Sequence, residues 1–85
     1  MNIEINIPNY RKEEGIKFVW DDNFTIESSI EGSIITIKAN EAGLRSLARQ
    51  LLTLAQPEVP SGNHMHYDDL NSLEDGSCEL IIEKI

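Results

Sequence analysis

The hydrophobic pattern of this chain changes its period once, at Asn40, and that change limits the folds open to it. Before Asn40, apolar residues alternate with polar ones, which is the pattern of half-buried β-strands. From Glu41 to Ala55 they recur every three or four residues, which indicates an amphipathic helix. Because 85 residues make at most one domain, the sequence predicts a single domain over residues 1–85.

Six segments have the pattern of strands. Four precede the helix and are joined by short turns, which favours an antiparallel meander: residues 3–7, 16–20, 24–30 and 33–39. Two follow it, residues 63–69 and 77–85. One helix covers only one face of a sheet. We therefore expect an α+β fold, a two-layer sandwich of mainly antiparallel sheet in the order ββββ-α-ββ, with the amphipathic helix packed on one face.

The helix has clear limits. Asn40 is a good N-cap, and Pro57 prevents the helix from continuing. Gly43 lowers helix propensity in the first turn, which is tolerated if the backbone packs closely there. The apolar stripe expected to face the sheet consists of Leu44, Leu47, Ala48, Leu51, Leu54 and Ala55.

The charge of the chain excludes some partners. Seven Lys and Arg stand against 15 Asp and Glu, a net charge of −8, which argues against nucleic-acid binding and against anionic membranes. Residues 1–49 hold eight acids and six bases, whereas residues 50–85 hold seven acids and one base. Such an acidic region suits a basic protein surface, although charge also keeps a protein soluble.

The expected location is the cytoplasm. A single cysteine, Cys78, forms no internal disulfide, which fits a reducing compartment. The first residues lack the basic start and apolar stretch of a signal peptide, and no apolar cluster is long enough to span a bilayer.

The residues most suited to chemistry lie between Gly62 and Asp69, where both histidines of the chain occur. On a strand, His64, His66 and Asp68 project from one face, and two imidazoles with a carboxylate are ligands for zinc, iron or manganese. A structural zinc would need a fourth ligand, which Cys78, Glu79 or Asp69 could supply if the last strand pairs with this one. Alternatively, these side chains contact a partner or form local hydrogen bonds.

Catalysis has little support in the sequence, and we expect no enzyme. Cys78 belongs to the predicted core face, and no basic residue is near it in sequence to activate the thiol. There is no Gly-x-Ser-x-Gly motif and no phosphate-binding glycine loop. Trp20, next to two acids, is either an interface anchor or a cap on the core beneath the helix.

The far face of the predicted sheet offers another partner site. Val19, Ile34 and Ile81 are more apolar than a solvated face needs. Scattered apolar residues on a surface are normal. Alternatively, these residues form a dimer or partner contact, and the chain is then a structural subunit that dimerises through this face.

Three stretches resemble a known family: the leucine-rich helix from Gly43 to Ala55, Gly62-x-His64-x-His66-x-Asp68, and the strand around Glu79-Leu80-Ile81-Ile82. In this order they resemble the immunity protein 32 family of bacterial polymorphic toxin systems, over about half of the chain. The first strands match only as generic β-structure.

The resemblance implies a small protein that binds and neutralises a co-encoded toxin domain. The positions expected to contact the toxin are His64, His66, Asp68, Asp69, Glu79 and Trp20. Acids near the C-terminus suit a basic toxin cleft, where complementary charge speeds association. The alternative from another class is a metal-binding or metal-sensing module at His64, His66 and Asp68.

Overall fold

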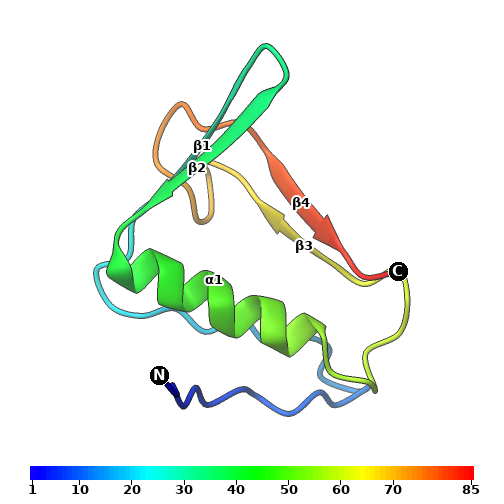
Figure 1. Cartoon of the computed structure of the whole chain (residues 1–85). Coiled ribbons are helices and arrows are strands. Elements are labelled where there is room, and N and C mark those ends of the chain that lie inside the picture. The colour runs from blue at the N-terminus through cyan, green and yellow to red at the C-terminus, as the bar shows by residue number, and fades with distance from the viewer.

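The computed structural model describes all 85 residues. The chain forms one helix and two antiparallel ribbons, and both ribbons lie above the helix in the view of Figure 1. The elements are β1 (Ile26–Glu31), β2 (Ile34–Ala39), α1 (Glu41–Leu54), β3 (His64–Tyr67) and β4 (Leu80–Glu83). The predicted α+β class is confirmed, but the four strands form two separate two-stranded sheets instead of one sheet of six strands.

The strands predicted at residues 3–7 and 16–20 are wrong. Residues 1–25 contain no strand, only an isolated bridge between Arg11 and Gly15. One reason is that the outer edge of β1 is already used over Ile26 to Ser28: β2 occupies one side, and Glu74 N–H and Cys78 N–H donate to Ile26 O and Ser28 O on the other. An alternating pattern does not reveal whether a sheet edge remains to pair with.

Polar side chains of the helix region bind the backbone of the N-terminal segment instead. Asp21 N–H donates to Ser46 Oγ at 2.8 Å, and Gln50 Nε2 donates to Val19 O at 3.3 Å. Gln56, just beyond α1, accepts a further backbone N–H and donates to a carbonyl of the same segment. The side chains of the helix thus satisfy backbone groups that would otherwise need a strand partner.

The first turn of α1 is tied to the hairpin, as the sequence predicts. Asn40 Oδ1 accepts from Gly43 N–H at 2.8 Å, which caps the helix, and from Thr25 N–H at 3.0 Å. A Cβ added at Gly43 would lie 2.5 Å from Thr25 O and 2.9 Å from Ile26 Cγ1. Close packing is therefore the reason that glycine stands in this turn.

The core is small and lies where the helix and the two ribbons meet. Its buried apolar side chains are Ile26, Leu54, Val59, Met65, Tyr67 and Leu73. Tyr67 OH donates to Gln50 Oε1 at 2.6 Å, so the buried hydroxyl and the buried amide satisfy each other. Burial raises the pKa of Tyr67 to about 12, since it disfavours the phenolate.

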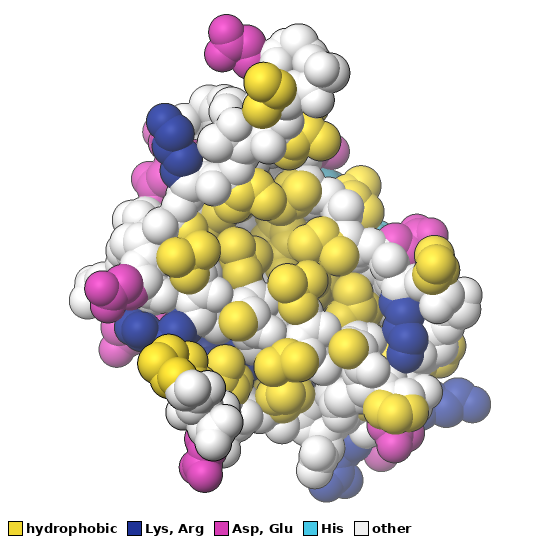
Figure 2. All heavy atoms as spheres, in the orientation of Figure 1, with side chains coloured by type: hydrophobic (Ala, Val, Ile, Leu, Met, Phe, Trp, Pro, Cys, Tyr) yellow, Lys and Arg dark blue, Asp and Glu magenta, His cyan; other side chains and the backbone are white.

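The expected orientation of the helix stripe is only partly correct. The buried helix positions are Gly43, Ser46, Gln50, Thr53 and Leu54. Leu44 and Leu51, expected in the core, are 56% and 44% exposed. Hydrophobic side chains gather on the face between the hairpin, α1 and the β3–β4 ribbon (Figure 2). With 14 residues, α1 is not long and apolar enough to cross a membrane.

Candidate functional site

The β3–β4 ribbon presents the two histidines to solvent. His64 and His66 are exposed, whereas Met65 and Tyr67 between them are buried. On β4, Leu80 and Ile82 stand opposite the two buried residues and pack against the core. The alternation predicted for the His-x-His segment is confirmed, because one face of this ribbon covers the core.

His66 lies among carboxylates. Its Nε2 is 3.3 Å from Glu79 Oε2 and 3.9 Å from Asp68 Oδ2. His64 instead places Nδ1 3.5 Å from Gly62 O. No group of three or more His, Cys, Asp or Glu side chains is arranged to hold a metal ion. His66 therefore contacts two carboxylates, whereas His64 contacts only a nearby backbone carbonyl, and both the metal site and the partner contacts stay predictions.

Asp68 has a local structural role. Strand β3 ends at Tyr67, and Asp68 Oδ1 accepts from the N–H groups of Leu70 and Asn71 at 3.0 and 3.1 Å. This carboxylate therefore closes the turn after β3. Asp69, the next residue, is exposed and is better placed to meet a partner.

Cys78 packs against the hairpin. Its Sγ lies 3.4 Å from Ser28 Oγ, and its backbone N–H donates to Ser28 O at 3.1 Å. The thiol is half-buried, and the residue, two positions before β4, connects that strand to β1 through its contacts with Ser28. These contacts give Cys78 a structural role.

Trp20 and His66, 46 positions apart in the sequence, line one shallow pocket. The pocket has a volume of about 190 Å³, and its walls are Phe18, Trp20, His66, Tyr67, Asn71 and Ser72. Trp20 stacks on Phe24 with ring centroids 4.3 Å apart and meets the edge of Tyr67 at 6.0 Å. Trp20 therefore borders the core and also forms part of this surface. The two roles predicted for it, a cap on the core and an interface anchor, do not exclude each other.

The contacts of Asp21 are not evident from the sequence, where it is only one of the two acids next to Trp20. Its carboxylate accepts from Arg49 at 2.7 Å and from Arg45 at 2.9 Å. Hydrogen bonds from Arg49 first, and then from Arg45, hold the pKa of Asp21 below its usual value. The two arginines are four residues apart on one side of α1, and that spacing was the available signal.

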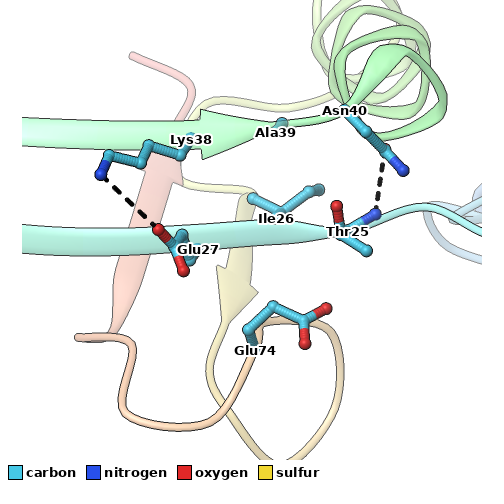
Figure 3. Close-up of a pocket in the computed structure, with 7 residues that line it drawn as sticks. All are labelled: Thr25, Ile26, Glu27, Lys38, Ala39, Asn40 and Glu74. Atoms are coloured by element: carbon cyan, nitrogen blue, oxygen red, sulfur yellow. Dashed lines mark hydrogen bonds and ion pairs between the residues drawn. The ribbon is translucent and has the colours of Figure 1, made fainter.

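The largest hollow lies elsewhere, at the junction of β1, β2 and the start of α1 (Figure 3). It is open, has a volume of about 370 Å³, and none of the predicted site residues lines it. Two of its side-chain groups already have partners: Lys38 pairs with Glu27 at 4.0 Å, and Asn40 accepts from Thr25. Few polar side chains of this hollow are therefore available to bind a ligand.

The far-face residues do not form one surface. Val19 belongs to the N-terminal segment, Ile34 to β2 and Ile81 to β4, and these pieces share no sheet. The predicted far face is therefore wrong as a single surface, because no continuous sheet carries these three residues, and dimerisation itself stays a prediction.

Comparison with known families gives one match. The family model described as immunity protein 32 matches residues 34–85, from the start of β2 to the last residue. The match includes the helix, the His-x-His strand and the final strand, which carried the resemblance. Comparisons with curated proteins and with solved structures find no match. Since the family model covers more than half of the chain, this chain belongs to the immunity protein 32 family.

Proposed function

We propose that this chain is an immunity protein that binds a cognate bacterial toxin domain and neutralises it by occupying its surface. The observation that carries the proposal is the family match over residues 34–85. An immunity protein of this kind acts as an inhibitor, and its effect depends on binding and not on turnover.

The acids near the C-terminus favour a basic toxin surface. All ion pairs with Lys or Arg join residues between Arg11 and Arg49. Lys84 is the only Lys or Arg after Arg49, and its ammonium group donates to Gln56 O at 2.7 Å. The exposed acids that have no Lys or Arg partner in this region include Asp69, Glu74, Asp75, Glu79 and Glu83. Because no Lys or Arg of the chain neutralises them, these carboxylates can attract a cationic partner.

The Trp20–His66 pocket supplies an anchor for that partner. Aromatic rings form part of its wall, and Glu79 contacts His66 at its border. An arginine or lysine of the toxin that entered this pocket would meet aromatic rings and, at the border, the carboxylate of Glu79. The proposed interface therefore combines one aromatic anchor with an acidic surround.

The test compares two triple variants with the same change in charge. One is Asp69→Asn, Glu79→Gln and Glu83→Gln; the control is Glu4→Gln, Glu13→Gln and Glu31→Gln, all exposed acids outside the site. Association with the toxin domain encoded beside this gene is measured at low and high salt. We expect the first variant to associate about tenfold more slowly at low salt and the control to stay near wild type.

Two results would contradict the acidic interface: an association rate that does not depend on salt, or equal slowing by both variants. Asp68 is left unchanged in this test because its carboxylate closes the turn after β3. If the toxin domain does not bind at all, the immunity function itself is wrong.

A further inference from the structure

The chain exposes more surface than a compact monomer of its size. Its accessible surface is 6203 Å², whereas a folded monomer of 9.6 kDa exposes about 5,100 Å². Its radius of gyration is 13.5 Å, against about 12 Å for 85 residues. The excess of about 1,100 Å² is similar to the roughly 800 Å² that each partner buries in a standard interface.

Five of the 14 exposed large apolar side chains belong to one side of the hairpin and one stripe of α1, which together we call the apolar face. It consists of Ile30, Ile35, Ile37, Leu44 and Leu51. In the hairpin register, the three isoleucines share a side with buried Ile26 and Ser28. This side leaves the core as it approaches the turn, so exposure rises from 41% at Ile37 to 60% at Ile30 and 66% at Ile35.

The helix continues the apolar face. Leu44 and Leu51 are seven residues apart, two turns along the helix, and half-buried Leu47 lies between them and the core. Figure 2 shows this region as a hollow of hydrophobic side chains, with most charged side chains at its edge. An exposed aliphatic area of this kind marks an interaction site.

We propose that a second copy of this chain covers the apolar face, in a symmetric dimer. Each copy carries a net charge of −8, so two copies repel each other wherever their acids meet. The five residues of the apolar face are uncharged, which makes this face suited to self-association. A two-fold axis places the same patch on both copies, so hairpin and helix of each contribute to one self-complementary interface.

A second copy fits the apolar face better than the toxin does. The proposed toxin contact is acidic and aromatic, and the residues of the Trp20–His66 pocket are not among those of the apolar face. A copy of the chain is also present whenever the chain is, so the aliphatic surface is covered before any toxin arrives. The dimer therefore leaves the proposed toxin site open.

Adjacent isoleucines provide a matched pair of variants. Ile34 and Ile35 are each 66% exposed, but successive strand residues point to opposite faces, and only Ile35 belongs to the apolar face. The mass of the purified full chain is measured by sedimentation equilibrium over a range of concentrations, without toxin. We expect a dimer for wild type and for Ile34→Glu, and a dissociation constant at least about tenfold higher for Ile35→Glu.

A monomeric wild type throughout the micromolar range would overturn the proposal, as would equal weakening by both variants. A monomer whose toxin binding is lost in Ile35→Glu alone would make the toxin the occupant, which also overturns it. Leu51→Glu tests the same face from the helix, in case the hairpin variant changes the fold seen by circular dichroism. Because these mass measurements contain no toxin, their result is independent of the proposed immunity function.

Discussion

Single residues fix the joint between the hairpin and the helix. Asn40 caps α1 and also holds Thr25, while Gly43 allows Thr25 O and Ile26 to approach the helix backbone. Such contacts make this joint the best-defined part of a fold whose core has only six buried apolar residues. The sequence pointed to both residues, because caps and breaks in helix propensity are local signals.

Gly43→Ala should destabilise the protein, although alanine favours a helix by about 1 kcal/mol over glycine. The added Cβ would meet a backbone oxygen and a core side chain, and overpacking of this kind costs about 1–3 kcal/mol or more. Urea unfolding followed by circular dichroism gives the free energy of unfolding. Glu41→Ala, in the same turn but exposed, is the control and should change it by about 0.5 kcal/mol or less. A Gly43→Ala protein as stable as wild type would show that the backbones can separate freely.

At the scale of elements, the predictions succeeded where the signals were local. The helix begins after Asn40 and ends at Leu54, shortly before Pro57, since a cap and a proline each act on the backbone of the adjacent turn. The hairpin at Gly32 and the strands β3 and β4 lie within the predicted segments. Residues 3–7 and 16–20 have an equally good alternating pattern, but the edge of β1 that they would need is occupied by Glu74 and Cys78. Strand pairing is a long-range property, and the pattern within a segment does not contain it.

The N-terminal segment should depend on Asp21 for its attachment to α1. Because hydrogen bonds from Arg49 and Arg45 lower the pKa of Asp21, the folded state favours the charged carboxylate more than the unfolded state does. This stabilisation is present above the usual pKa of about 3.8 and is lost as the pH falls through the lower folded value. Asp21→Asn should therefore make the amides of residues 1–25 exchange faster at neutral pH, and wild type should approach this behaviour in acid.

Asp22→Asn is the matched control for this experiment. Asp22 is exposed and has no ion-pair partner, so the change removes the same charge one position away without removing a contact. Hydrogen exchange measured residue by residue separates the two variants. Equal acceleration of exchange by both would mean that the overall charge of the segment, and not the contact with the arginines, holds it in place.

At the scale of the whole molecule, the sequence indicates which way single side chains of the candidate site point. It does not indicate which of them lie together on one surface. The outward direction of His64 and His66 follows from alternation alone, and it is correct. The pocket that joins Trp20 to His66 depends on how the N-terminal segment crosses the β3–β4 ribbon, and no local pattern encodes that crossing. The helix stripe was assigned to the core because amphipathic helices usually bury their apolar face, yet here Ser46 and Gln50 are buried instead. Leu44 and Leu51 therefore lie on the surface and belong to the face that we propose a second copy covers.

The uneven charge of the molecule should make its stability rise with moderate salt. Six of the seven Lys and Arg lie in residues 1–49, five of them paired with acids, so the acids of residues 50–85 repel one another without compensation. Screening shortens the range of this repulsion to about 8 Å at physiological ionic strength. We expect the thermal midpoint of wild type to increase by a few degrees between low and physiological salt. The Asp69→Asn, Glu79→Gln and Glu83→Gln variant should start higher and increase less, whereas the Glu4, Glu13 and Glu31 variant should follow wild type more closely.

A midpoint that falls with salt in wild type would instead mean that the pairs at Asp21 and Glu14 outweigh the repulsion, and that the C-terminal acids are too far apart to act as one surface.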